Sequence, residues 1–447
     1  MNPLLGALLL LLIGLLGARL SFGQRRGPLG PRLIFVTGTH FLFLGFILGA
    51  EGLGLITRAL IDGLFPFIAL GLGWIGLLFG VQLDQAQLRR FPAGFLRFTL
   101  LQGALAFIAF AAVGFLLLAA LDLDTTPRVL TVLLAAATAC VSTPAGIALI
   151  RHNYLLAGKT SELLLFIASL DAIVGIVALQ LIYAAYHPAG PLLGASAIGG
   201  AEWLFMALAI AVALAVMFLW LSRPKPARDD IVLFLLGLVV FGAGAALYLG
   251  LSPLFICGLA GALLANLSPL RRRLYTVLEG WEKPIYVVLL ILAGALLSFE
   301  TWLLVPTTAL YFLLRTASKL AGGWVASGVV DTGFAVPGSI GLGLVSQGGI
   351  SVAMVISAAL SHGLLRQTRD PTIELLFSTV VLAVVLSELT GPFLSRSLLR
   401  RLGEIKPRVE AALAEGREPG AAEAFDRPES QPERGAHADR GRRANEP

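Results

Sequence analysis

Two stretches of the chain place helix-breaking and small polar residues inside apolar sequence: TACVSTPAGIALIRHN, from residue 138, and GLGLVSQGGISVAM, from residue 341. The residues concerned are Ser142, Thr143, Pro144, Gln347, Gly348 and Gly349. Pro144 lacks an amide N–H and clashes with the carbonyl one turn earlier, and paired glycines leave helical geometry at little steric cost. Carbonyls and half-helix ends freed in this way can bind an ion. The alternative is two simple kinks relieved by the neighbouring polar side chains.

One carboxylate, Asp171, stands alone among apolar residues in SLDAIVGIVAL, about ten residues into an apolar run. An ionisable group at that depth of a membrane is costly and marks a functional site by default. Burial favours its protonated form and a nearby cation favours its charged form, so proton and metal cation can compete for it. We therefore predict a transient monovalent-cation site at Asp171. The alternative is a structural partner for a buried arginine or lysine.

Two cations are spaced to meet this carboxylate. Arg315 and Lys319 in YFLLRTASKLAGGWVASG are four residues apart and therefore share one face of a helix. Lysine gives up its proton readily when buried, whereas arginine stays charged. We predict Lys319 as the switchable counter-charge of Asp171 and Arg315 as a structural or gating charge, with Glu388 as a candidate partner of Arg315. The alternative is that both cations extend to the membrane interface.

The composition defines the class of protein that positions these residues. The chain of 447 residues is 57% hydrophobic and 13% charged, whereas soluble domains are nearer a quarter charged. A membrane helix needs roughly 20 apolar residues, and many such runs occur. We predict an all-α polytopic membrane protein with about thirteen transmembrane helices, at 3–20, 33–50, 64–82, 95–120, 128–150, 161–185, 202–221, 231–249, 251–268, 284–299, 302–328, 339–361 and 373–397.

Basic residues in the loops predict the orientation. They concentrate in alternate loops, which the positive-inside rule assigns to the cytoplasm, so the net charge of +6 does not indicate a nucleic-acid partner. The N-terminus is then outside and the C-terminus cytoplasmic, and only SHGLLRQTRD, with Arg366 and Arg369, disagrees. The polar tail 401–447 is predicted to be disordered. The first run is predicted to be a retained helix, with a signal peptide as the alternative.

The thirteen spans divide into six, one and six. Repeat one covers about 1–185, a linker helix about 202–221, and repeat two about 231–400. The fifth helix of each half carries one of the two breaks, and the single intervening span inserts the second half in inverted orientation. Inverted repeats with two broken crossing helices in matching positions are typical of transporters whose site lies near the bilayer midplane.

Five motifs in this order carry a resemblance to a known family: LLFGVQLDQAQLRR, ATACVSTPAGIALI, SLDAIVGIVAL, SPLFICGLAGALLANL and RTASKLAGGWVAS. Over about 1–400 the chain resembles the monovalent cation:proton antiporters, in particular the Kef-type and bacterial sodium/proton exchanger branch. The resemblance implies a dimer in which a core domain moves against a dimerisation domain like an elevator. It also implies that Asp171 binds cation and proton alternately, beside Ser142, Thr143 and Gln347.

Two positions depart from the family pattern. Leu170 stands where members usually carry Asp, Asn or Gln before the essential Asp, and Gln347 stands near the place of a frequent basic residue. A single carboxylate favours one-for-one exchange. The resulting prediction is a homodimeric inner-membrane antiporter of H⁺ and Na⁺ or K⁺, without a cofactor. It is not predicted to be an enzyme, since no nucleophile–base pair appears. An ion-coupled organic anion carrier and a non-transporting membrane sensor or assembly subunit are the alternatives.

Overall fold

The computed structural model describes residues 12, 38–123, 125–187, 199–223, 227–362 and 370–414. These residues form helices joined by turns and contain no strand, which confirms the predicted all-α class. The helices are α3 (Thr39–Leu48), α4 (Arg58–Val81), α5 (Gln85–Leu88), α6 (Ala93–Ala120), α7 (Thr126–Ala139), α8 (Ala145–Asn153), α9 (Lys159–Leu170), α10 (Ala172–Ala185), α11 (Gly200–Leu221), α12 (Arg228–Leu249), α13 (Pro253–Leu267), α14 (Arg271–Ala295), α15 (Leu304–Val329), the 3₁₀ helix η1 (Gly338–Leu344), α16 (Gly349–His362), α17 (Pro371–Arg401) and α18 (Pro407–Ala414).

Each predicted span from 33–50 onward overlaps one of these helices or a pair of them. By length and composition, five of the described helical stretches are able to cross a membrane, and η1 with α16 adds a sixth that is bent by 70°. The number thirteen therefore stays a prediction. Most of the first span, 3–20, lies outside the described residues, as do the loop residues Arg19, Arg25, Arg26, Arg32, Lys225, Arg366 and Arg369.

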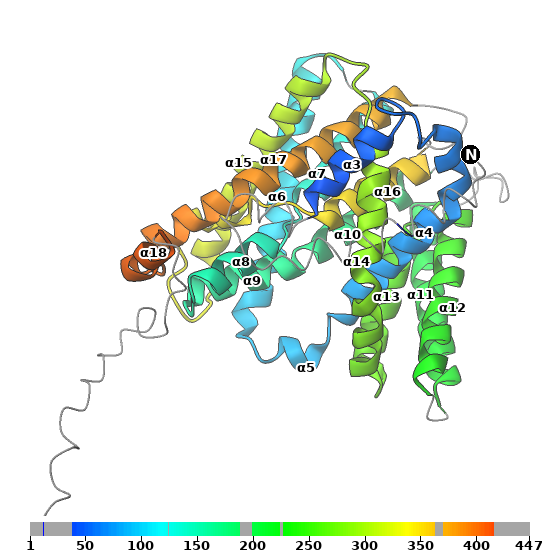
Figure 1. Ribbon diagram of the computed structural model, residues 1–447, viewed down its shortest axis with the longest axis horizontal. Coiled ribbons are helices and arrows are strands. Elements are labelled where there is room, and N and C mark those ends of the chain that lie inside the picture. The colour runs from blue at the N-terminus through cyan, green and yellow to red at the C-terminus, as the bar shows by residue number, and fades with distance from the viewer. Residues whose placement is uncertain are drawn as a thin grey trace, which may run out of the picture.

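The helices pack as two bundles (Figure 1). The scaffold bundle consists of α3, α4 and α11 to α14, with α13 packed closely along α4 and α14 against both α3 and α4. The site bundle consists of α6 to α10, α15, η1, α16 and α17, in which α15 contacts α6, η1 and α17. Figure 1 shows α11 to α14 side by side at one end of the molecule, and α6, α15 and α17 toward the other. Helices α10 and α16 make contacts between the bundles.

Small residues allow the closest helix pair to form. A Cβ atom added at Gly80 of α4 would lie 1.9 Å from the carbonyl oxygen of Gly258 in α13. No larger residue fits there without separating the helices. Between membrane helices, lipid is as apolar as the side chains, so close backbone packing at small residues replaces the hydrophobic driving force. The glycine-rich motif SPLFICGLAGALLANL thus forms a packing surface for α4.

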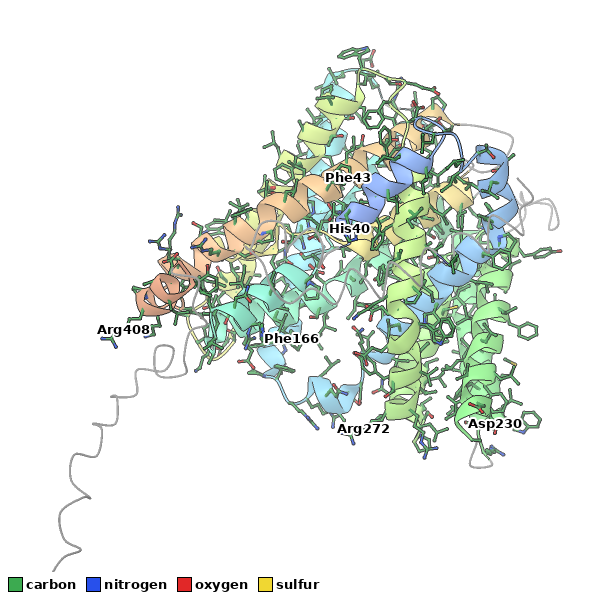
Figure 2. The ribbon with its side chains drawn as sticks, viewed as in Figure 1. His40, Phe43, Phe166, Asp230, Arg272 and Arg408 are labelled. Carbon is green, nitrogen blue, oxygen red and sulfur yellow. The ribbon has the colours of Figure 1, made fainter. Side chains whose placement is uncertain are left out.

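The flanks of the bundles are apolar and their ends are charged. Large apolar side chains are exposed along α11, α12 and α15, including Phe205, Phe241 and Trp324, which are 72%, 65% and 69% exposed. Figure 2 shows the labelled Asp230 and Arg272 at the ends of their helices, α12 and α14. Exposed apolar surface of this extent marks contact with lipid or protein. This distribution agrees with the predicted membrane protein.

The predicted disordered tail 401–447 is wrong for its first part. Residues 407–414 form α18, whose Val409 and Ala412 are fully buried. Glu410 accepts a 2.5 Å salt bridge from Arg396 and another of 3.3 Å from Arg400, both on α17. An apolar stripe and one well-placed carboxylate therefore dock the helix, although the segment is polar on average. Residues 415–447 lie outside the described residues.

Glu404, between α17 and α18, caps the helix that leads to Asp171. Its two carboxylate oxygens accept hydrogen bonds from the amides of Thr160 (2.8 Å) and Ser161 (3.1 Å) at the start of α9. We expect Glu404→Ala to destabilise the protein by about 1 to 2 kcal/mol, because two helix N-terminal amides lose a charged acceptor. Thermal unfolding in detergent, with the exposed Glu51→Ala as control, measures the change. Equal unfolding midpoints for Glu404→Ala and wild type would refute the cap.

Candidate functional site

The two predicted breaks meet inside the site bundle. Helix α7 ends at Ala139 and α8 begins at Ala145, while η1 ends at Leu344 and α16 begins at Gly349. The amide of Thr143 donates to the carbonyl of Ser346 at 3.1 Å, and the hydroxyl of Ser142 donates to the carbonyl of Leu344 at 3.0 Å. Non-helical backbone at membrane depth persists only where protein or a water-filled cavity satisfies it. Here each broken segment supplies part of the other's hydrogen bonding.

The two breaks have different physical causes. Pro144 is the N-cap of α8, so its missing N–H falls where a helix needs none. Gly348 and Gly349 are not in the left-handed region of the backbone, so conformational freedom is not their role. A Cβ atom at Gly349 would lie 2.4 Å from the ring of Tyr286 in α14. The second break therefore needs glycine for close approach, which corrects the reason expected from the sequence.

Asp171 lies between α9 and α10, in the middle of the 27-residue helical stretch Lys159–Ala185. It is completely buried, and its Oδ2 accepts a 2.8 Å salt bridge from the equally buried Lys319. Its Oδ1 accepts a 3.0 Å hydrogen bond from the amide of Ser142. Lys319 also donates to the hydroxyl of Ser142 at 2.9 Å and to the carbonyl of Cys140. The ammonium thus uses all three of its protons.

Arg315 holds the two breaks together instead of contacting Asp171. Its guanidinium donates to the carbonyls of Val141 (2.8 Å) and Val345 (2.5 Å) and, at longer distance, to those of Leu344 and Ser346. These carbonyls follow the C-terminal ends of α7 and η1, where the helix dipoles carry negative charge. Within the described residues Arg315 makes no salt bridge to Glu388, so the predicted pairing of these two is wrong.

Gln347 and Thr143 lie at the crossing without contacting Asp171. The Gln347 amide donates to the carbonyl of Thr138 (3.0 Å) and to the hydroxyl of Tyr311 (2.9 Å). The Tyr311 hydroxyl is also 3.0 Å from that of Thr138. Sequence reasoning missed Tyr311, although it precedes Arg315 by four residues and therefore shares its helix face. Gln347 thus ties the second break to α7 and α15.

A cavity of about 410 Å³ opens beside the crossing. The site bundle contributes Ser142, Thr143, Gly348 and Glu388 to its lining, and the scaffold bundle contributes residues of α4 and α14, including Tyr286. Asp171 does not line the cavity, but Ser142 does and contacts Asp171 through its amide. The cavity therefore reaches the buried ion pair through one residue of the first break.

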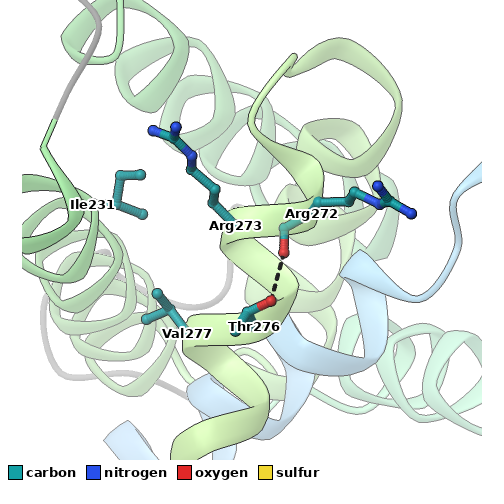
Figure 3. A pocket seen from close by; sticks show the side chains of 5 residues that line it. All are labelled: Ile231, Arg272, Arg273, Thr276 and Val277. Atoms are coloured by element: carbon teal, nitrogen blue, oxygen red, sulfur yellow. Dashed lines mark hydrogen bonds between the residues drawn. The ribbon is translucent and has the colours of Figure 1, made fainter.

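A second cavity, of about 250 Å³, lies between α12 and α14 (Figure 3). Figure 3 shows Arg272 and Arg273 extending away from α14, with the Thr276 hydroxyl donating to the Arg272 carbonyl at 3.0 Å. None of its lining residues belongs to the first cavity. Within the described part of the chain, no group of three His, Cys, Asp or Glu side chains is arranged to hold a metal ion.

Two interrupted helices that cross beside a buried ion pair are the architecture of secondary-transporter folds. No protein-family model and no curated protein matches the sequence. The fold is similar to that of the sodium proton antiporter MjNhaP1 from Methanocaldococcus jannaschii. The structure of that protein at pH 8 has a TM-score of 0.63 and 16% identity, covering 91% of this chain and 98% of that one. An electron-microscopy map of the same antiporter gives a TM-score of 0.53 and 15% identity, with 92% and 97% covered. The fold that the sequence resemblance implies is thus confirmed by its similarity to a solved sodium proton antiporter.

Proposed function

We propose that the protein is a secondary antiporter that exchanges protons for a monovalent cation, Na⁺ or K⁺, with Asp171 as the shared site. The observation that carries the proposal is the buried Asp171–Lys319 ion pair at the crossing of two broken helices. A buried carboxylate with a titratable partner can bind a proton or a cation, and binding of one lowers its affinity for the other. The fold of the sodium proton antiporter MjNhaP1 supports the same reading.

The ion pair supplies a mechanism for coupling. Asp171 and Lys319 form one buried ion pair, and the exchangeable proton lies in the salt bridge between them. In the proton-loaded state Lys319 neutralises Asp171, as the 2.8 Å salt bridge illustrates. An arriving cation takes the place of the ammonium, and the pair releases its proton. One proton released per cation makes the exchange electroneutral. Two protons released per cation would move one net charge across the membrane. A membrane potential of 100 mV contributes about 2.3 kcal/mol per charge moved.

The position of the cavity supports alternating access by an elevator-type movement. Because the cavity lies between the scaffold and site bundles, a displacement of one bundle against the other would close it and open a path on the opposite side. We propose a homodimer in the inner membrane, built on thirteen spans in a six-one-six inverted repeat. The N-terminus is outside and the C-terminus cytoplasmic. The exposed apolar faces of α11 and α12 suit lipid or a second copy of this chain.

The experiment that tests this function uses purified protein in liposomes that contain a pH dye. A proton gradient is imposed and Na⁺, K⁺ or Li⁺ is added in turn, with Asp171→Asn beside the wild type. Cation-evoked pH change that is lost in the variant supports the antiporter and identifies its ion. If no cation moves protons through folded protein, the antiporter fails. Uptake of an organic anion would then favour the carrier, whereas an effect of Asp171→Asn on signalling or assembly alone would favour the sensor.

Ser142→Ala is expected to raise the KM for the cation about tenfold or more. The Ser142 hydroxyl contacts the Lys319 ammonium at 2.9 Å, and it offers an oxygen to a cation that replaces that ammonium. A hydrogen bond to a charged group is worth about 1.5 to 3 kcal/mol, which corresponds to roughly 10- to 150-fold in affinity. The control is Ser169→Ala, because Ser169 lines the same cavity but donates to Leu165 in its own helix. Equal KM values for both variants would contradict the role.

A further inference from the structure

We propose that Glu388 is a second cation-binding carboxylate. Together with Thr143, which it meets beside Gly348, it forms an access subsite that holds a monovalent cation between the cavity and Asp171. The proposal deepens the antiport function proposed above and rests on it for the identity of the ligand. Glu388 belongs to α17, the last helix of the site bundle. It lies within electrostatic range of Arg315 but forms no salt bridge with Arg315 or Lys319 among the described residues.

Glu388 is buried, and one of its two carboxylate oxygens lacks a hydrogen-bond partner among the described residues. Its side chain is 4% exposed and lines the cavity. Its Oε2 has no hydrogen-bond partner among the described residues, and the group makes no salt bridge there. Buried carboxylates are normally paired or hydrogen-bonded, because desolvation of an isolated charge is costly. A carboxylate that is more than nine-tenths buried, lines a cavity and has one oxygen without a hydrogen-bond partner therefore points to a ligand that the protein itself does not supply.

The lack of a side chain at Gly348 lets Thr143 and Glu388 approach the same point of the backbone. A Cβ atom at this position would lie 2.8 Å from the Cβ and 2.9 Å from the hydroxyl oxygen of Thr143, and 3.2 Å from Oε1 of Glu388. One hydroxyl and one carboxylate oxygen thus converge on the same small volume at the end of the second break. Oxygen atoms of this kind replace the hydration shell of monovalent cations. Any larger residue at position 348 would displace Thr143 and press on Glu388.

The subsite lies on the path to Asp171. Thr143 follows Ser142 in the chain, and Ser142 contacts both Asp171 and Lys319. Thr143, Ser142, Gly348 and Glu388 all line the cavity, whereas Asp171 does not. A cation that enters through the cavity meets Glu388 and Thr143 first. It then passes from Thr143 to the neighbouring Ser142, which contacts Asp171.

The test measures equilibrium binding of radioactive sodium and rubidium to the purified full-length protein, together with exchange in liposomes. We expect Glu388→Gln to raise the KM for the cation at least fivefold and to change kcat less than twofold. Gly348→Ala is expected to raise the KM in the same direction, because its methyl group would displace the Thr143 and Glu388 oxygens. Glu388→Asp is expected to have an intermediate effect. Glu374→Gln, on the first turn of the same helix, is the control for charge and folding.

A second comparison separates this subsite from Asp171. Asp171→Asn is expected to keep weak cation binding, and Asp171→Asn combined with Glu388→Gln to lose it. Unchanged KM in Glu388→Gln, or no cation binding in Asp171→Asn, would overturn the subsite. The two proposals fail in distinguishable ways: an antiporter with wild-type KM in Glu388→Gln lacks the subsite. A protein that binds cations through Glu388 without exchanging protons has the subsite but is no antiporter.

Discussion

Asp171→Asn is expected to reduce proton-coupled cation exchange in liposomes by roughly 100- to 1000-fold or more. The substitution removes the charge that Lys319 neutralises at 2.8 Å and leaves a buried ammonium facing a neutral amide. Breaking one partner of a buried pair costs about 3 to 5 kcal/mol, which corresponds to this range in affinity. Asparagine is almost isosteric with aspartate and keeps an oxygen for the Ser142 amide. A loss of exchange would therefore result from the removed charge and not from a change of shape.

The control for Asp171→Asn is Glu162→Gln, which neutralises a carboxylate in the first turn of the same helical stretch. It is expected to retain exchange close to the wild-type rate. Both variants should elute from size-exclusion chromatography as the wild type does, which separates a transport defect from misfolding. Cation exchange that survives in folded Asp171→Asn would exclude this carboxylate as the shared site.

Arg315→Met is expected to destabilise the protein by about 3 to 5 kcal/mol, comparable to the loss of one partner of a buried ion pair. Arg315 is completely buried, and its guanidinium contacts carbonyls of both broken segments, Val141 and Val345 among them. Methionine is similar in length but donates no hydrogen bond, so these carbonyls lose their common donor. The remaining contacts of the crossing, such as that between Thr143 and Ser346, do not replace it.

Thermal unfolding in detergent measures this effect. Arg315→Lys is the matched comparison: it keeps the charge but not the planar fork that reaches several carbonyls at once, so it is expected to recover only part of the stability. Thr316→Val, at the next position of α15, where the hydroxyl bonds only its own helix, is the control. If Arg315→Met and the wild type had the same unfolding midpoint, the crossing would not depend on the guanidinium.

Much of the helical architecture could be predicted from the sequence, because apolar runs and basic loops are local patterns. The span predicted at 95–120 is observed as α6, Ala93–Ala120, and the one at 202–221 as α11, Gly200–Leu221. The docking of α18 could not be predicted from the sequence, because it depends on a salt bridge between Glu410 and Arg396 across a turn. Similarly, the α9 cap joins Glu404 to Thr160, more than two hundred residues apart.

The candidate site was predictable to the extent that helix periodicity places charges. The four-residue spacing of Arg315 and Lys319 predicts a shared face, and the structure places Lys319 in contact with Asp171. The spacing does not say which cation reaches the carboxylate and which reaches the backbone of the breaks. The cavity-facing position of Glu388 depends on how α17 packs against both breaks, which no local pattern specifies.

The central claim, that cation and proton share the Asp171–Lys319 pair, is tested most directly by counting protons released on cation binding. Purified protein in weakly buffered solution with a pH dye is titrated with sodium or potassium chloride, with choline chloride as the control for ionic strength. Metal binding to titratable ligands displaces their protons, so the wild type should release about one proton per cation bound. Asp171→Asn should release none. Cation binding to the wild type without proton release, or equal release in both proteins, would contradict the shared site.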